Sequence, residues 1–200
     1  MERLIFTLGH STHSIERFIE LLRIHRVSAV ADVRSHPYSR MNPQFSREAL
    51  TNALRRHRVA YAFLGRELGA RPEDRACYVD GRASYALISR TPLFQSGLDR
   101  IVDGHTRYRI ALVCAEKDPM TCHRAILVCR HLVRLGFSVN HILASGGIEE
   151  HDTSLRRLAA QMGNPLNDLF RSYQELVEDL YDRRGREIEY MEANSAEAPS

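Results

Sequence analysis

The chain has 200 residues, of which 44% are hydrophobic and 26% are charged. This length and composition are typical of one globular domain and exclude collagen-like, coiled-coil and wholly disordered chains. The net charge of +3 is too small for a protein that coats DNA by its charge alone. No apolar run is long enough to cross a bilayer, and the first residues lack a signal-peptide pattern, so we expect a cytoplasmic protein without membrane contact.

The first part of the chain alternates apolar runs with amphipathic helical patterns. Strands are predicted over residues 4–8, 27–33 and 59–64. Ser14 is the expected cap of the helix after the first strand, and Ser46 that of the helix after the second. The stretch 65–84 is rich in Gly, Arg and Asp and lacks periodicity, so we predict a long loop there.

The same alternation continues after that loop. A helix containing Leu98 precedes a strand predicted over residues 108–114, and another strand is predicted over 137–143. A helix over 122–135 separates these two strands, and the glycine at 136 ends it in the position that helix C-termini favour. Residues 152–190 are helical in pattern and charged.

Strands separated by helices imply a parallel sheet with right-handed crossovers. We therefore predict an α/β fold: a three-layer, Rossmann-like, mostly parallel sheet of about five strands with helices on both faces, plus C-terminal helices. Residues 1–158 would form a single α/β domain, 159–190 a C-terminal helical extension and 191–200 a flexible tail. The oligomeric state stays open, and the C-terminal helices could form the contact of a homodimer.

Polar residues gather where the predicted strands end. In parallel sheets, ligands bind beyond the carboxyl ends of the strands. The residues that follow four of the strands are His10 and Ser11, Asp32 and Arg34, Gly65 and Arg66, and Cys114 and Glu116. These strand ends are expected to converge on one polar rim.

The densest group of reactive residues is the segment 114–124. Its N-cap pattern at residues 118–119 predicts a helix with Cys122 in or just after the first turn, where the helix dipole favours a thiolate. Arg124 would lower the pKa of that thiol further and could hold an anion. Cys114 at the strand end is expected to face the same space, and Glu116 is a candidate general acid or base.

Three functional interpretations of this segment stay open, beside one in which the cysteines are inert core residues. In the first, Cys114 or Cys122 is a nucleophile, with a histidine, at position 123 or 10, as its base. In the second, both thiols and a histidine bind a metal. In the third, Arg124 and the helix N-terminus bind phosphate while the thiols only pack.

The sequence argues against the metal interpretation in two ways. Neighbouring residues on a helix point about 100° apart, which makes Cys122 and His123 a poor chelating pair. The spacing of the four cysteines fits neither a CxxC pair nor a zinc finger; they are Cys77, Cys114, Cys122 and Cys129. We therefore expect no metal and no other cofactor.

A second polar group follows the strand over 27–33. Asp32 at the end of a buried strand needs a partner, and Arg34 lies two residues on along the same face. The pair is either a structural ion pair or part of a site. Arg40 and Asn42 lie in the next loop with further polar and aromatic residues, which favours a polar, anionic, planar ligand.

Several short motifs follow one another along the chain. They are Gly9-His10-Ser11, Asp32-Val33-Arg34, the Pro37 to Phe45 loop, Leu68-Gly69-Ala70-Arg71, Tyr85-Ala86 before Thr91-Pro92, Cys114-Ala115-Glu116 with Cys122-His123-Arg124, and His141-Ile142. Over residues 3–158 the chain resembles the domain of unknown function family 488. The resemblance implies an α/β fold, a site at the motif positions and chemistry related to nucleotides or nucleic acids. At 145–147 the chain has Ser-Gly-Gly where many members have Asp-Gly, which weakens a role for an acid there.

The leading hypothesis is an enzyme that acts on a phosphate-bearing ligand, a nucleotide or nucleic acid, with hydrolysis and group transfer both open. The candidate catalytic residues are Cys114, Glu116, Cys122 and Asp32. The candidate substrate-binding residues are His10, Ser11, Arg34, Arg40, Asn42, His123 and Arg124. One rival is a non-catalytic nucleotide or nucleic-acid binding module in which Tyr38 and Phe45 stack on bases. The other is a small Cys/His metalloprotein.

Overall fold

The structure, a computed structural model, describes residues 3–192 and has a mostly parallel six-stranded sheet. The strand order is β3-β2-β6-β1-β7-β8. The strands are β1 (Leu4–Gly9), β2 (Ala29–Asp32), β3 (Ala60–Phe63), β6 (Ile110–Cys114), β7 (Ser138–Ile142) and β8 (Ile148–Glu150). The first five are parallel and β8 is antiparallel at one edge. The five predicted parallel strands are confirmed.

Helices surround this sheet. The longer ones are α1 (Ile15–Ile24), α2 (Arg47–Arg56), α5 (Pro92–His105), α7 (His151–Gln161), α8 (Tyr173–Ile188), and a helix over 124–134 made of a π-helical part (Arg124–Cys129) and α6 (Arg130–Arg134). The short ones are the 3-10 turns Pro43–Phe45, Arg75–Cys77 and Pro119–Thr121, with α3 (Gly65–Leu68) and α4 (Tyr85–Ile88). No helix among the described residues is both long and apolar enough to cross a membrane.

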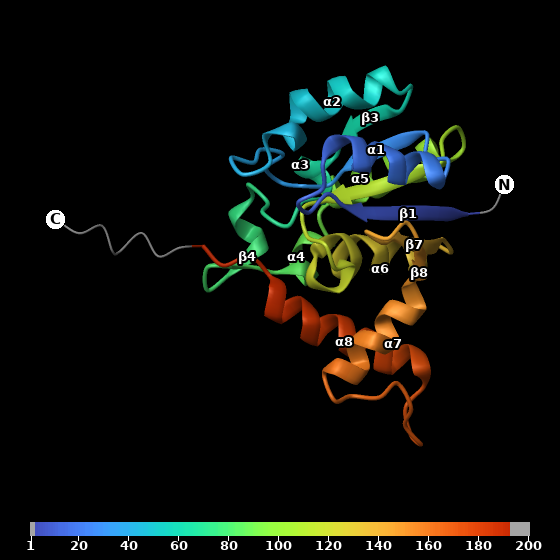
Figure 1. The fold of residues 1–200 in the computed structure, drawn as a ribbon. Coiled ribbons are helices and arrows are strands. Elements are labelled where there is room, and N and C mark those ends of the chain that lie inside the picture. The colour runs from blue at the N-terminus through green and yellow to red at the C-terminus, as the bar shows by residue number, and fades with distance from the viewer. Residues whose placement is uncertain (1–2, 193–200) are drawn as a thin grey trace.

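Two hydrophobic clusters lie on the two faces of the sheet. On one face, Phe18 of α1 and Leu54 of α2 pack against Val30 and Val113 of the central strands. On the other face, residues of α5, the 124–134 helix, α7 and α8 pack together around Leu112. In Figure 1, α1 and α2 accordingly lie on the opposite side of β1 from α7 and α8. This is the predicted three-layer arrangement.

The connections place a crevice beside β6. The chain leaves β2 through α2 on one face, and it leaves β6 through the 124–134 helix on the other face. Neighbouring parallel strands whose connections diverge in this way leave a gap beyond their carboxyl ends, where ligands bind in open α/β sheets. Asp32 pairs with Val113 in the sheet register, so the residues after β2 and β6 start at the same level.

The C-terminal helices belong to the same hydrophobic core as the sheet. Leu180 and Tyr181 of α8 are buried in the cluster that holds α5 and α7. Arg130 forms ion pairs with Glu178 and Asp182, which join the 124–134 helix to α8. The part of the chain predicted as an extension from residue 159 is therefore packed onto the α/β core (Figure 1).

Local signals in the sequence correctly predict where some of the helices begin and end. The Ser14 side chain accepts a hydrogen bond from the Arg17 N–H at the start of α1, and Gly136 has a φ of +81° after the 124–134 helix. Ser46 precedes α2, but its side chain makes no capping bond to α2 and donates to the Pro43 carbonyl instead.

Three predictions are corrected by the structure. The 65–84 loop contains α3, a 3-10 turn, and the hairpin β4–β5 (Tyr78–Val79 and Arg82–Ala83), because hydrogen bonds and buried residues such as Leu68 order it. The helical stretch 152–190 is interrupted between α7 and α8. In the predicted tail, Met191 pairs with Arg82 and is therefore anchored, and 193–200 lie outside the described residues.

Candidate functional site

A cleft of about 340 Å³ lies beyond the carboxyl ends of β2 and β6. Its lining residues are Arg34, Ser35, His36, Tyr38, Ala70, Arg71, Tyr85, Cys114, Ala115, Glu116, Thr121, Cys122, His123, Ile188 and Tyr190. Five of them were predicted as site residues. A larger hollow of about 720 Å³ lies between the 124–134 helix and α8, and none of the predicted site residues lines it. The cleft is therefore the candidate site.

Two thiols, an imidazole and a carboxylate meet in this cleft. The Cys114 thiol donates to the Glu116 carboxylate, with the sulfur 3.0 Å from Oε2. His123 Nδ1 lies 3.8 Å from Cys114 Sγ and 3.8 Å from Cys122 Sγ. The other ring nitrogen, Nε2, is 2.9 Å from the Val33 carbonyl, which can only accept, so Nε2 carries the proton. Nδ1 is the ring nitrogen that faces both sulfurs. Burial lowers the pKa of His123, but the charge and hydrogen bond of Cys122 outweigh burial and raise that pKa above its ordinary value.

The two thiols have pKa values shifted in opposite directions. The hydrogen bond to Cys122 and burial both raise the pKa of Cys114 well above its ordinary value. Burial alone would raise the pKa of Cys122 too, but the bond from Cys114 and the charges of Arg124 and His123 hold it well below the ordinary value. Of the two thiols, Cys122 is therefore the one that loses its proton more easily.

The backbone around Cys122 explains why these groups converge. Cys122 has φ −135° and ψ 140°, so it is extended and lies between the 3-10 turn 119–121 and the next helix. The backbone N–H of Arg124 donates to Cys122 Sγ at 3.4 Å, a capping contact at the start of that helix. Because Cys122 is outside the helix, its side chain and that of His123 can point into one space. The predicted poor chelating geometry is therefore wrong.

Cys114, Cys122 and His123 form a group that could hold a metal ion. Their three ligand atoms all lie within 4.8 Å of one another, and all three residues are buried. Glu116 lies beside this group, with its carboxylate 3.0 Å from Cys114 Sγ, but does not belong to it.

Asp32 lies beneath the cleft and holds Arg34. Its Oδ1 accepts from Arg34 Nε at 2.8 Å and its Oδ2 from Arg34 Nη2 at 2.6 Å, a bidentate ion pair. The Tyr61 hydroxyl donates to the same carboxylate at 2.9 Å. Arg34 Nη1 takes no part in this pair, and Arg34 lines the cleft while Asp32 is fully buried. Asp32 is therefore placed to orient Arg34.

Arg124 is also beneath the cleft, with 1% of its surface exposed. Its guanidinium donates to the carbonyls of Glu116 and Lys117, at 2.8 and 3.3 Å, and its Nε lies 3.4 Å from the Thr7 hydroxyl. These bonds fix the loop that carries Glu116. Arg124 thus contributes a fixed charge behind Cys122 and does not line the cleft.

His10 and Ser11 support the same loop from β1. The His10 N–H donates to the Cys114 carbonyl and the Ser11 N–H to the Ala115 carbonyl, each at 2.9 Å. Burial lowers the pKa of His10 to about 4, and its ring stacks on Phe45 with centroids 4.4 Å apart. Both residues lie next to the cleft-lining segment but do not line the cleft themselves.

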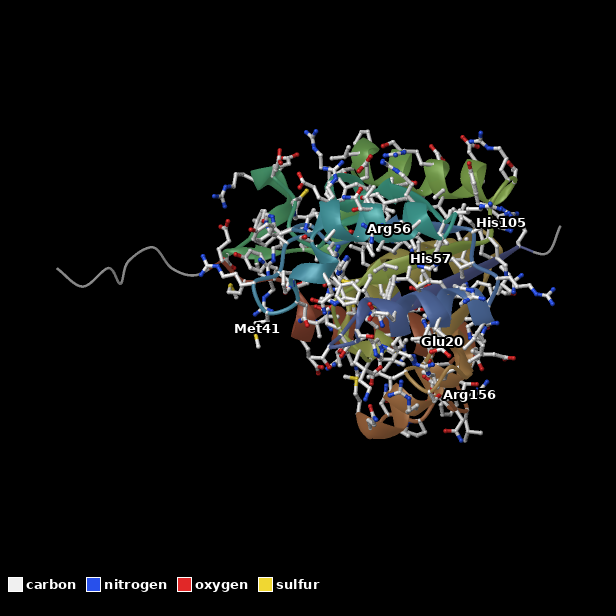
Figure 2. All side chains as sticks on the ribbon, turned by 45° about the horizontal axis from the view of Figure 1, so that its top comes forward. Glu20, Met41, Arg56, His57, His105 and Arg156 are labelled. Carbon is white, nitrogen blue, oxygen red and sulfur yellow. The ribbon has the colours of Figure 1, made fainter. Side chains whose placement is uncertain are left out.

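Arg40 and Asn42 are not brought to the cleft. Arg40 is exposed and Asn42 is half-buried. Met41 between them is 91% exposed, and Figure 2 shows its side chain pointing away from the body of the molecule. Phe45, a predicted stacking residue, is fully buried beneath His10. Tyr38 is 79% exposed and does line the cleft.

Other lining residues were not predicted. Tyr85 and Arg71 lie in motifs that carry the family resemblance, so the motifs themselves were a signal for them. Ile188 is the last residue of α8 and Tyr190 follows it, and the Arg71 guanidinium lies 4.2 Å from the centroid of the Tyr190 ring. Nothing in the sequence near residue 190 links it to residues 114–123.

Comparisons with known proteins give one match. The family model described as Domain of unknown function DUF488 matches residues 14–130, more than half of the chain. The match includes Asp32, Arg34 and the whole 114–124 segment, whereas β1 and the C-terminal helices lie outside it. No curated protein and no solved structure matches the chain.

Proposed function

Because the chain belongs to the family Domain of unknown function DUF488, whose description assigns no activity, we propose a function from the cleft: the protein is an enzyme that acts on a phosphate-bearing ligand, a nucleotide. One observation carries this proposal. The two thiols, the imidazole and the carboxylate line a cleft that is also lined by arginines and tyrosines.

The charges that line the cleft favour an anion. Among the described residues, Arg34 and Arg71 line it against a single acidic residue, Glu116. Guanidinium groups suit phosphate because their planar donors match its oxygens in pairs. Arg34 is held by Asp32 with Nη1 outside the ion pair, and Arg71 is exposed over Tyr190. Both arginines can therefore donate to a ligand without losing their present partners.

The tyrosines favour a planar group on that anion. Tyr38, Tyr85 and Tyr190 line the same cleft, and aromatic rings beside an arginine are a common surface for stacking a base. The volume of about 340 Å³ lies at the small end of ligand pockets, which range over roughly 300–1,000 Å³. These features support a single nucleotide rather than a nucleic-acid strand.

The reactive groups favour an enzyme over a binding module. A module that only binds needs the arginines and tyrosines, but it has no use for a low-pKa thiol next to an imidazole and a carboxylate. Perturbed titratable groups that meet in a cleft are typical of active sites. Glu116 is the exposed member of this group and so the candidate acid or base toward a ligand.

The test begins with binding. We expect at least one of a panel of nucleoside mono-, di- and triphosphates to bind the full chain more tightly than its parent nucleoside in isothermal titration calorimetry. Arg71→Ala should lower that affinity about tenfold, the loss of one charge-assisted contact of about 1.4 kcal/mol. Arg40→Ala is the matched control and should leave it unchanged, since Arg40 is outside the cleft. Equal effects of the two substitutions would refute the assigned binding site.

The second measurement is turnover of the nucleotide that binds, followed by chromatography of the products. Glu116→Gln should keep the binding affinity and lose most of the turnover. If the wild-type protein binds the nucleotide and converts none of it, the enzyme is refuted in favour of a non-catalytic binding module.

A further inference from the structure

We propose that Cys114, Cys122 and His123 bind one divalent metal ion of the zinc class, with its fourth position open toward the cleft. This inference goes beyond the proposed function, because it rests on the ligand geometry and not on the nucleotide. Thiolate and imidazole are the ligands that zinc prefers in proteins. Three protein ligands and one open position are typical of catalytic zinc sites.

The distances fit a tetrahedral ion. Zinc–sulfur bonds of about 2.3 Å and zinc–nitrogen bonds of about 2.0 Å place sulfur and nitrogen about 3.6 Å apart in a tetrahedron. Here both sulfurs lie 3.8 Å from His123 Nδ1. All three ligand atoms are within 4.8 Å of one another, as expected for side chains that share one ion.

The surrounding contacts are those of a metal ligand set. Metal-bound histidines donate their other ring N–H to a carbonyl or carboxylate, which fixes the ring and its tautomer. His123 does so through Nε2 to the Val33 carbonyl at 2.9 Å. The Arg124 backbone N–H contacts Cys122 Sγ, a bond that supports a thiolate ligand. His123 is thus oriented as a ligand before any ion is present.

The charges also fit a dication. Two thiolates neutralise the ion, and the charge of the buried Arg124 guanidinium acts on the Glu116 carboxylate. Because all three ligands line the cleft, the remaining position is open to water or to an atom of a ligand there. Glu116, next to Cys114, supplies an acid–base group beside that position.

The test is metal binding by the full chain, prepared without metal under reducing conditions. We expect Co²⁺ to bind with one equivalent per chain and to give thiolate-to-cobalt charge-transfer absorption with the intense visible bands of a tetrahedral site. Zn²⁺ should displace it. Cys114→Ser, Cys122→Ser and His123→Gln should each weaken Co²⁺ binding by at least about tenfold. Cys129→Ala is the matched control, because Cys129 is a buried thiol in the 124–134 helix and lies outside the group; this variant should bind like the wild type.

X-ray absorption of the zinc-loaded wild-type chain tests the metal ligands without any variant, so a variant that folds poorly cannot affect the result. We expect two sulfur neighbours and one nitrogen neighbour in the first shell. A shell without sulfur, absence of the charge-transfer band, or an equal loss in Cys129→Ala would overturn the metal site. Arg71→Ala should lower nucleotide affinity and leave Co²⁺ binding unchanged, so failure of the metal site and failure of the proposed function give different results.

Discussion

The ion pair beneath the cleft gives the sharpest stability prediction. Asp32 is fully buried, and its carboxylate accepts from Arg34 Nε, Arg34 Nη2 and the Tyr61 hydroxyl. Asp32→Ala removes all three acceptor contacts and leaves the Arg34 charge buried without its partner. Breaking a buried pair from one side costs about 3–5 kcal/mol, because the remaining charge loses its compensation. For a chain of this size, that corresponds to a fall in Tm of about 6–20 °C.

The assay is urea denaturation at neutral pH, with the midpoint and slope fitted for each variant. Glu20→Ala is the matched control, because Glu20 (Figure 2) forms an exposed pair with Arg17 whose loss should cost about 0.2–1 kcal/mol. In an Arg34→Met background the cost of Asp32→Ala should shrink by about 0.5–3 kcal/mol, since no buried charge is left behind. An Asp32→Ala midpoint equal to that of Glu20→Ala, or strictly additive double-mutant costs, would refute the reasoning.

Three further predictions concern other parts of the fold. Burial holds the pKa of His151 at about 4 and that of His141 well below its ordinary value, so both are neutral when folded, while the unfolded chain takes up protons below about pH 6.5. The unfolding free energy from urea titrations should therefore fall between pH 6.5 and pH 4, by about 3 kcal/mol for His151 alone. A Cβ on Gly9 would lie 1.8 Å from the Glu116 carbonyl oxygen, so Gly9→Ala should destabilise the fold by at least about 1–3 kcal/mol in urea denaturation. Ser14→Ala removes the cap of α1 and should cost about 1 kcal/mol by the same measurement.

Each of these has its own control. The pH dependence should be smaller in His151→Gln, and an unchanged slope there would contradict the assignment to this histidine. Gly147→Ala places a Cβ in ordinary contact only, 3.5 Å from the Ser145 hydroxyl, and should be nearly neutral. Ser46→Ala removes an N-cap side chain that makes no capping bond, so a loss as large as that of Ser14→Ala would contradict the capping argument.

The sequence predicts the parallel strands well, because each buried parallel strand is a separate apolar run in the sequence. The runs before Gly9, Val33 and Leu64 are such cases. β8 is not predicted, since Ile148-Glu149-Glu150 is short and polar, and it forms only because β7 offers an edge. The hairpin β4–β5 is missed for a similar reason, because its two-residue strands show no periodicity.

The site is predictable where it follows from strand ends and not where it follows from loop paths. The rule that ligands bind beyond the carboxyl ends of strands selects Cys114, Glu116 and Arg34, which do line the cleft, and also His10 and Ser11, which lie next to it. Arg40 has the right chemistry but its loop turns away, and the path of a loop depends on contacts that a single sequence does not display. The convergence of Cys122 and His123 depends likewise on one extended residue between two helical turns.

The position of Ile188 and Tyr190 in the cleft couples ligand binding to the docking of α8. A ligand that contacts Tyr190 and the segment after β6 together binds only molecules in which α8 is packed in place. By mass action, the bound ligand lowers the population of molecules in which α8 is detached. The population falls by a factor of one plus the ratio of the ligand concentration to Kd. Amide hydrogen exchange along α8 should then slow in proportion, including in turns that touch no ligand. The C-terminal helix would thus report the occupancy of a cleft built mainly from residues far earlier in the chain.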